Sequence, residues 1–254
     1  MDIWGPITIT YVDGHRYFLT VVNDFSRHTW IFLLKTKSEV QGSIKSFITL
    51  VETQFSTTVK CIRSDQGPEF NLHQFYSLKG IEHQMSCVET PQQNGVVERK
   101  HKHILNITRA PIFQNNLSKL FWNFVVSHVV FLLNKLPNKV LHNKSPYDIL
   151  YDTSPDLIFI KVFGCEAFAS TLTHNRTKLD PWARQSIYLG HRRGIKGSLH
   201  YDLYTKEVFL SRNVYFNENS FSFKHIINHT NSENFVMSLI SFSLDPPCWR
   251  SHID

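Results

Sequence analysis

Cysteine is scarce in this chain of 254 residues, which contains four, and no two of them form a Cys-x-x-Cys pair. A disulfide-stapled secreted fold or a zinc knuckle needs cysteines at close, paired spacing, so the sequence disfavours both classes. This usage indicates a reducing compartment. The four positions are Cys61, Cys87, Cys165 and Cys248.

Long hydrophobic runs are missing as well. The most apolar stretch, residues 120–133, contains Asn123 and His128. It is shorter than the ~20 residues that span a bilayer, so it predicts a buried helix. The first residues carry no signal-peptide pattern. We therefore expect a soluble intracellular protein, in the nucleus or the cytoplasm, with no membrane partner.

Strong charge of either sign is also absent. Charged residues make up 19% of the chain, the net charge is +6 and the pI is about 9.1. This modest basic excess favours a polyanionic partner only weakly. Hydrophobic residues, at 42%, suffice to bury a core, and the length allows one large and one small domain.

The first part of the chain alternates between strand and helix patterns. Residues 17–22 and 29–34 are rich in β-branched and aromatic side chains and flank a polar turn, which predicts two antiparallel strands. A helix is expected from Ser38, with Gln41 completing a capping box. Its apolar face recurs at helical spacing and predicts core packing: Val40, Ile44, Phe47, Ile48 and Val51.

A strand–helix–strand pattern follows. Residues 59–64 predict a short buried strand with Asp65 at its carboxyl end, the edge at which sites form in open α/β sheets. A short helix at 72–78 and a strand at 82–86 come next. Further along, Pro111 is expected to end or kink a long helix, because proline removes a helical donor.

Beyond an expected linker that begins at 145–148, the pattern changes to short β-rich pieces separated by turns. Five such pieces predict a small barrel: 162–163, 166–170, 186–190, 199–203 and 208–210. Residues 220–254 show no strong pattern, so we expect a poorly ordered tail there.

Residues 90–101 have the sequence Thr-Pro-Gln-Gln-Asn-Gly-Val-Val-Glu-Arg-Lys-His, a polar loop that leads into a helix. Glu98 falls in the first helical turn, where the helix dipole favours an anion by ~0.3–1 kcal/mol. Lys102 follows one turn later, with Arg109 on nearly the same stripe. A carboxylate beside cations suits a site that holds a metal ion and receives phosphate. The alternative is a solvated helix face whose i,i+4 pairs contribute ~0.2–0.5 kcal/mol each.

Two upstream motifs favour the first interpretation. They are Asp-Ile-Trp-Gly-Pro at residues 2–6 and Ser-Asp-Gln-Gly-Pro-Glu-Phe at 64–70. Together with 90–101 they resemble the integrase core of Copia-type LTR retrotransposons, and the likeness extends to about residue 219. Phe-Gly-Cys at 163–165 is among the motifs that resemble the SH3-like module that follows this core.

The resemblance implies two domains. Residues 1–150 would form an α/β integrase core, a ribonuclease H-like mixed five-stranded sheet with flanking helices. Residues 157–219 would form a small all-β SH3-like barrel, with 220–254 as the tail.

The resemblance also implies metal-dependent DNA chemistry. Asp2, Asp65 and Glu98 would be catalytic and would hold two Mg²⁺ or Mn²⁺ ions, with Asp65 between them, since hard divalent ions prefer carboxylate oxygens. One reaction trims a DNA 3′ end, and the next joins the new 3′-hydroxyl to target DNA. The implied partners are element ends, target DNA and further copies of the chain. The residues implied in DNA contact are Gln93, Asn94, Gly95, Arg99, Lys102 and Arg109.

Several features depart from the family pattern. Fewer residues separate Asp65 from Glu98 than in the family, and Pro68 stands where glycine is common. Asp2 follows the initial methionine directly, so we expect a truncated first strand and no zinc-binding module of the kind that normally precedes the core. The alternative function is therefore an inactive integrase relic that only binds nucleic acid or a partner.

Further acids and histidines lie close to these motifs and could support the site or bind zinc. Glu69 is a candidate for a supporting role next to Asp65. His101 and His103 do not form a zinc pair, because their i,i+2 spacing splits them across the helix. An unrelated acid–base hydrolase built on Asp65 and Glu98 would leave the Trp-Gly-Pro and Gln-Gln-Asn-Gly motifs unexplained.

Overall fold

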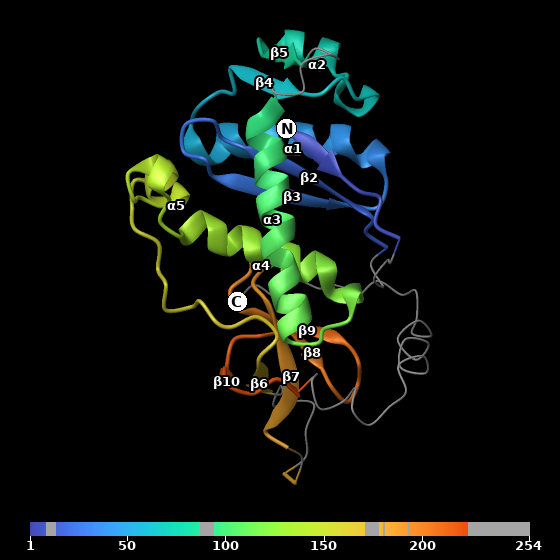
Figure 1. The fold of residues 1–254 in the computed structure, drawn as a ribbon, viewed down its shortest axis with the longest axis vertical. Coiled ribbons are helices and arrows are strands. Elements are labelled where there is room, and N and C mark those ends of the chain that lie inside the picture. Colours follow the sequence, from blue (N-terminus) through green and yellow to red (C-terminus); the bar gives the residue numbers. More distant parts are fainter. Residues whose placement is uncertain (9–13, 87–93, 171–177, 180, 193, 223–254) are drawn as a thin grey trace.

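The computed structural model describes residues 1–8, 14–86, 94–170, 178–179, 181–192 and 194–222. An α/β half lies at the top of Figure 1 and a strand-rich half at the bottom. Helix α3 (Gly95–Gln114) runs from one half to the other, and α4 (Trp122–Lys135) crosses it between them (Figure 1). These two helices connect the halves.

The first sheet of the α/β half is antiparallel, in the order β1-β2-β3. Its strands are β1 (Asp2–Trp4), β2 (Tyr17–Val22) and β3 (Thr29–Leu34). The bounds of β2 and β3 are those predicted from their β-branched and aromatic residues. Asp2 lies directly opposite Thr20 in the β1–β2 ladder, a pairing on which the site depends.

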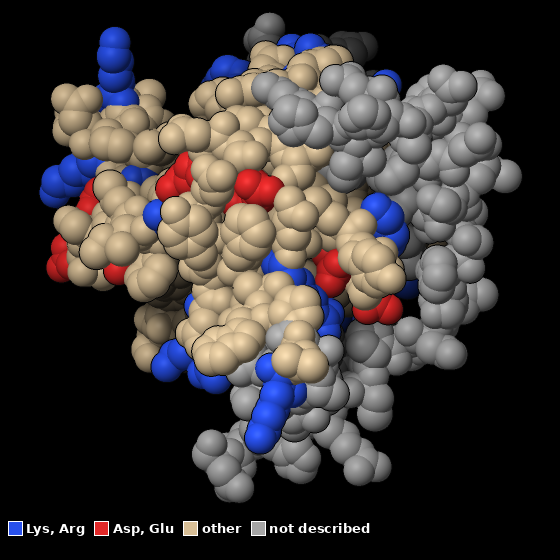
Figure 2. All heavy atoms as spheres, turned by 90° about the horizontal axis from the view of Figure 1, so that it is seen from below, with Lys and Arg blue, Asp and Glu red and all other residues tan. Residues whose placement is uncertain are grey.

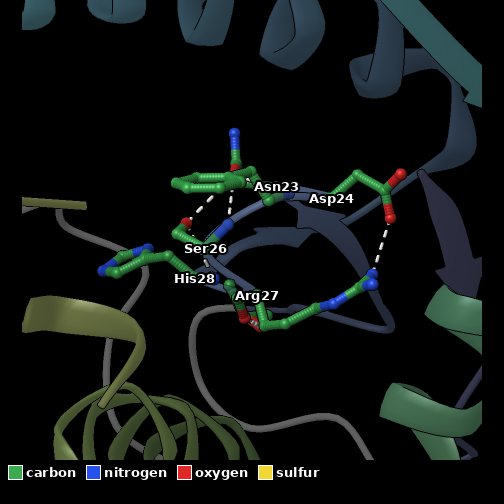
Figure 3. A network of polar contacts seen from close by, with 7 residues as sticks. Asn23, Asp24, Ser26, Arg27 and His28 are labelled. Carbon is green, nitrogen blue, oxygen red and sulfur yellow. Dashed lines mark hydrogen bonds and ion pairs between the residues drawn. The ribbon is translucent and has the colours of Figure 1, made fainter. Parts of the chain in front are cut away.

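A compact polar turn joins β2 to β3 (Figure 3). Oδ1 of Asn23 accepts hydrogen bonds from the backbone N–H of Ser26 (2.8 Å) and from its hydroxyl (3.0 Å). Arg27 adopts a left-handed φ of 58° and donates to Asp24 at 2.6 Å. Asparagine suits such turns because its side chain replaces a backbone acceptor. The turn fixes the register of the two strands.

Helix α1 (Val40–Phe55) begins later than the sequence predicts. Ser38 lies in a preceding 3₁₀ turn, η1 (Lys37–Glu39), where its hydroxyl is 2.7 Å from that of Thr36. No side-chain cap closes α1, so the predicted capping box with Gln41 is wrong: the hydroxyl already has a closer partner. The predicted apolar face is confirmed, with four buried residues: Val40, Ile44, Phe47 and Ile48.

A parallel ladder joins β4 (Cys61–Ser64) to β5 (Glu82–Met85). The connection consists of the 3₁₀ turn η2 (Pro68–Phe70) and helix α2 (His73–Lys79). Strand, helix and strand therefore follow in the predicted order, and Asp65 directly follows β4.

The predicted mixed five-stranded sheet is divided into these two ladders in the described part of the chain. β1 and β4 still lie side by side, because the terminal amine of Met1 donates to the carbonyl of Arg63. β4 ends at Ser64, one residue after Arg63, and no ladder is formed between β1 and β4 in the described part of the chain. The predicted α/β class, with strands in both orientations, is confirmed.

The buried helix predicted at 120–133 is confirmed as α4, and Asn123 and His128 are both buried in it. The side chain of Asn134 accepts from the N–H of Thr29 (2.9 Å) and donates to its carbonyl (2.7 Å), which ties α4 to β3. Across the described residues, we find no helix with the length and apolarity that a membrane span requires.

The ends of α3 and α4 follow local sequence signals in part. α3 continues past Pro111 to Gln114, so the predicted end at Pro111 is wrong, and a kink there stays a prediction. Pro111 has no N–H, so the carbonyl of Ile107 lacks the usual helical donor. The next helical segment is capped by Ser118, whose hydroxyl accepts the N–H of Leu120 at 3.3 Å. That segment is the 3₁₀ turn η4 (Lys119–Phe121), which leads into α4.

The linker predicted to begin at 145–148 instead starts helix α5 (Pro146–Tyr151). Ser145 and Asp148 form a reciprocal capping box. The N–H of Ser145 donates to the Asp148 carboxylate (2.7 Å), and the N–H of Asp148 donates to the Ser145 hydroxyl (3.0 Å). Two orphan donors are thereby satisfied, which stabilises this short helix. A further 3₁₀ turn, η5 (Lys139–Leu141), lies between α4 and α5.

The strand-rich half is a five-stranded antiparallel sheet in the order β10-β6-β7-β8-β9. Four of the five predicted strands are confirmed with small shifts, 162–163 is not a strand, and β10 was not predicted. The strands are β6 (Glu166–Ser170), β7 (Ala183–Gly190), β8 (Ser198–Asp202), β9 (Val208–Ser211) and β10 (Val214–Asn217).

β9 and β10 are consecutive in the chain but form opposite edges of this sheet. Only Arg212 and Asn213 separate Ser211 from Val214, so these two positions lie at most ~11 Å apart. The sheet must therefore curl until its edges approach each other at this corner. This curl gives the barrel-like shape, although no ladder closes it among the described residues.

The two halves share a hydrophobic core. Phe121 is fully buried, and its ring lies 5.0 Å from that of Tyr201 on β8. The same cluster includes Phe18 of the first sheet and Ile187 of β7. A second cluster lies between the first sheet, α1 and α2. The expected integrase core and SH3-like module are therefore packed on each other.

The expected tail at 220–254 lies mostly outside the described residues, which end at Ser222. The part that is described contacts the sheet. The carbonyl of Ser220 accepts the N–H of Glu166 at 2.8 Å, and the Ser222 hydroxyl donates to the Glu166 carboxylate at 3.1 Å. Residues 220–222 are therefore held against the strand-rich half.

Candidate active site

Asp2 opens β1, and both of its carboxylate oxygens are engaged. Oδ1 accepts the N–H of Ile3 at 2.8 Å, and Oδ2 lies 3.1 Å from Nδ1 of His101 on α3. The side chain is only 18% exposed. Asp2 is therefore held in one orientation at the boundary between the first sheet and α3.

Asp65 directly follows β4, as predicted, and its Oδ1 accepts the N–H of Gly67 at 3.2 Å. Burial raises the pKa of the Asp65 carboxyl above its usual value, and the negative charges of Asp2 and Glu69 raise it further. The Gly67 hydrogen bond and Lys37 act in the opposite direction. Several carboxylates therefore repel one another around Asp65, and a cation would relieve this repulsion.

Glu69 shares a tight corner with Asp65. A Cβ on Gly67 would lie 2.9 Å from the carboxyl carbon of Glu69 and 3.1 Å from Oδ1 of Asp65. Both carboxylates thus approach the glycine so closely that an added side chain would displace them. Lys37 forms an ion pair with Glu69 at 3.0 Å. The supporting role considered for Glu69 agrees with this position.

Glu98 lies in the first turn of α3 and is half-buried. The start of α3 is fixed beside β1, because the Asn94 amide donates to the carbonyl of Met1 at 3.3 Å. One turn after Glu98, at i+3, His101 contacts Asp2. Glu98 therefore lies on the helix face that borders Asp2.

The three acids do not close into one coordination sphere. Among the described residues, no hydrogen bond or ion pair engages Glu98, and no group of three His, Cys, Asp or Glu side chains is close enough to hold a metal ion. Asp2 and Asp65 interact electrostatically, whereas Glu98 is not among the charges that shift the Asp65 pKa. The donor set is nevertheless all carboxylate oxygen, the chemistry that Mg²⁺ and Mn²⁺ prefer.

The residues predicted to contact DNA divide into two groups. Lys102, Arg109 and Arg99 are exposed on α3, although the Arg99 guanidinium folds back over Gly95. Asn94 and Gly95 are buried at the start of the helix, and the amide of Asn94 is turned towards Met1. The predicted residue Gln93 lies outside the described residues.

Sequence reasoning considered His101 only as a zinc ligand and so missed its contact with Asp2. His101 is 6% exposed, and its Nε2 lies 2.8 Å from the hydroxyl of Thr20 on β2. The spacing of three residues from Glu98 was the available signal, since it places His101 on the face of the helix that carries the predicted acid.

Comparisons with known proteins identify two domain families in the chain. Residues 1–91 match the integrase core domain family, and residues 165–229 match the retroviral polymerase SH3-like domain family. The chain is 34% identical over 227 residues to the retrovirus-related Pol polyprotein from transposon RE1 of Arabidopsis thaliana, across 89% of the chain. It is 33% identical over 252 residues to that from transposon RE2 of the same plant, across 99% of the chain.

A relative from tobacco is equally similar. The retrovirus-related Pol polyprotein from transposon TNT 1-94 of Nicotiana tabacum is 34% identical over 220 residues, across 85% of the chain. The chain spans only 15% to 17% of the length of these three relatives. A cryo-EM structure of a simian T-cell lymphotropic virus intasome with PP2A regulatory subunit B56 gamma aligns with a TM-score of 0.45 and 16% identity, covering 83% of this chain and 75% of that one.

The two matched domains occur in the order that the sequence motifs imply. The first match covers the α/β half up to residue 91, with Asp2 and Asp65 but not Glu98, and the curled sheet falls within the second match. The chain thus belongs to the Copia-type retrotransposon Pol family, and within it carries an integrase core domain followed by the retroviral polymerase SH3-like domain.

Proposed function

We propose that this chain catalyses metal-dependent 3′-end processing of element DNA and its transfer into target DNA. The observation that carries the proposal is the carboxylate corner around Asp65, where burial and the charges of Asp2 and Glu69 raise the carboxyl pKa. Carboxyl groups whose pKa is shifted by burial and by neighbouring charges are often found at functional sites, and a divalent cation would relieve the repulsion between them.

Asp2, Asp65 and Glu98 would hold the metal. Bound Mg²⁺ or Mn²⁺ would supply a nucleophilic oxygen near neutral pH and neutralise charge that develops on the phosphodiester. Asp65 would contribute the central ligand, because it lies next to both Asp2 and Glu69. Glu98 has no partner among the described residues, so its carboxylate is available to complete the site.

The cations of α3 would bind the DNA backbone. Lys102 and Arg109 are exposed on the helix that begins at the acidic site. Contacts of this kind contribute affinity and salt dependence but little choice of sequence. The partners we propose are therefore element ends and target DNA in the nucleus, with several copies of the chain acting together so that two ends can be joined.

A second candidate function is nucleic-acid binding without catalysis. One observation favours it: among the described residues, no three His, Cys, Asp or Glu side chains lie close enough together to hold a metal ion. The short spacing between Asp65 and Glu98 points the same way. In this case the basic face of α3 would still hold DNA.

A strand-transfer assay separates these functions. A labelled duplex with the element's end sequence should be joined to a target plasmid in Mn²⁺ by the unmodified chain. Asp65→Asn should lower the rate by roughly a thousand-fold or more, because transition-state charge is no longer neutralised. The matched control is Asp24→Asn, whose carboxylate is 77% exposed in the β2–β3 turn and should leave the rate unchanged.

The contradicting result is a folded, DNA-binding chain whose product yield equals that of Asp65→Asn. Filter binding of the same duplex at several salt concentrations supplies the binding measurement. Retained binding with no joining would favour the second function.

A further inference from the structure

His101 projects from α3 onto the first sheet and is almost completely buried. It is 6% exposed, and the ring meets that of Phe18 edge to face, at 5.4 Å and 83°. Its Nε2 lies 2.8 Å from the Thr20 hydroxyl, and its Nδ1 lies 3.1 Å from Oδ2 of Asp2. Both ring nitrogens therefore have partners, and packing fixes the ring plane.

The sheet register explains why one histidine reaches both groups. Asp2 and Thr20 lie directly opposite each other on β1 and β2, and such cross-strand neighbours project to the same face of a sheet. Helix α3 lies along this sheet (Figure 1). His101 projects from α3 and spans the cross-strand pair.

From this geometry we infer that His101 is the positioning residue of Asp2: it orients a metal-binding carboxylate before the metal arrives. The inference rests on the proposed function, because it assigns Asp2 a metal. In this role His101 contacts neither the metal nor the DNA, and it acts only through Asp2.

The hydrogen-bond directions support a fixed arrangement. Nδ1 of His101 lies 3.1 Å from Oδ2 of Asp2, and because a carboxylate has no proton to donate, a proton between the two groups belongs on Nδ1. In a neutral ring Nε2 then accepts, and the Thr20 hydroxyl is its donor. The Thr20 hydroxyl thus holds Nε2 of the ring, and this leaves Nδ1 facing Asp2. Such supporting partners of metal ligands commonly alter metal affinity by ~10–100-fold.

The second carboxylate oxygen is held as well. Oδ1 of Asp2 accepts the N–H of Ile3 at 2.8 Å, and Oδ2 faces Nδ1 of His101, so each oxygen has one polar neighbour. Each oxygen keeps a further lone pair for a cation. A carboxylate that is oriented in advance loses less rotational freedom when a metal binds.

A purely structural role predicts a different pattern. If His101 only satisfied the buried hydroxyl of Thr20 and filled the space beside Phe18, its contact through Nε2 would matter and that through Nδ1 would not. Two amide side chains separate these contacts. Asparagine places its amide near the position of Nδ1, and glutamine places its amide near that of Nε2.

The experiment is a Mn²⁺ titration, followed by electron paramagnetic resonance of the free ion, on His101→Asn and His101→Gln. His101→Asn keeps a donor to Asp2 and should retain the wild-type affinity within ~3-fold. His101→Gln keeps only the Thr20 contact and should weaken Mn²⁺ binding by ~10-fold or more. Thermal unfolding of each variant is measured in parallel.

Thr20→Val is the second variant, because it preserves the shape of the side chain and removes the hydroxyl that holds Nε2. We expect it to weaken Mn²⁺ binding by ~3–10-fold while the fold is kept. It keeps the inference testable if His101→Gln does not fold.

The outcomes separate this inference from the function on which it rests. Equal Mn²⁺ affinity in the wild type, His101→Gln and Thr20→Val would overturn the positioning role and leave the metal site intact. Equal loss in folded His101→Asn and His101→Gln would also overturn it, because the donor to Asp2 would then be irrelevant. A wild type that binds no Mn²⁺ would overturn the proposed function itself.

Discussion

Phe121→Ala should destabilise the protein by about 3–5 kcal/mol, because a large, fully buried ring is removed from a close-packed core. Phe121 is 0% exposed, and its ring lies 5.0 Å from that of Tyr201, so the cavity would open between α4 and the strand-rich half. Urea unfolding followed by tryptophan fluorescence measures the loss. The integrase core and the SH3-like sheet should lose stability together, since both contribute to this cluster.

Phe25→Ala is the matched control for the same chemical change. Phe25 is 81% exposed at the β2–β3 turn, and its removal should change the free energy of unfolding by no more than about 0.5 kcal/mol. A loss below about 1 kcal/mol in Phe121→Ala would contradict the shared core. Separate transitions for the two halves in the wild type would contradict it as well.

Acidification from pH 7 to pH 5 should lower the free energy of unfolding by about 2 kcal/mol for each of two buried histidines. Burial lowers the pKa of His128 and of His200 to about 4, whereas an unfolded histidine titrates near 6.5. The positive charge of His191 adds to both shifts. Between these pKa values the unfolded chain binds more protons, so stability is full above about pH 6.5 and falls as the pH decreases towards 4.

The test is urea unfolding at several pH values with one histidine removed. His200→Gln keeps an amide donor for the Ser198 hydroxyl, which lies 2.7 Å from Nε2 of His200, and should remove about half of the pH dependence. His103→Gln, at an exposed position on α3, should leave the pH dependence as it is. A flat free energy of unfolding between pH 7 and pH 5 would show that these rings are not held neutral.

Strands with a clear period were predictable from the sequence. Tyr17–Val22 and Thr29–Leu34 have the predicted bounds. Their β-branched and aromatic residues flank a turn in which Asn23 accepts local hydrogen bonds. β10 (Val214–Asn217) was missed, since it follows β9 after two residues and its partner, β6, lies far away in the sequence. Long-range pairing of this kind leaves no local signal.

Helix ends were predicted less well, because several groups compete for the same partners. The hydroxyl of Ser38 bonds Thr36 rather than α1. By contrast, Ser145 and Asp148 form a capping box in a segment expected to be a linker. The end predicted at Pro111 is also wrong, because α3 continues for three residues beyond it, to Gln114.

The site was predictable in its residue types and only partly in its geometry. Asp65 lies at the carboxyl end of β4, and its neighbour Glu69 approaches the same glycine. The position of Glu98 relative to the other acids depends on the path of the chain before α3, which residue spacing does not determine. The contact between His101 and Asp2 depends on how α3 sits against the sheet, so only the structure could reveal it.

Mn²⁺ binding by isothermal calorimetry tests the central claim that the carboxylates around Asp65 form a metal site. The wild type should bind Mn²⁺, and Asp65→Asn should lose at least ~10-fold in affinity, because one carboxylate ligand is gone. Glu52→Gln is the control, since Glu52 pairs with Lys79 elsewhere on the surface and should bind like the wild type. Absence of binding in the folded wild type, or equal binding in Asp65→Asn, would contradict the account.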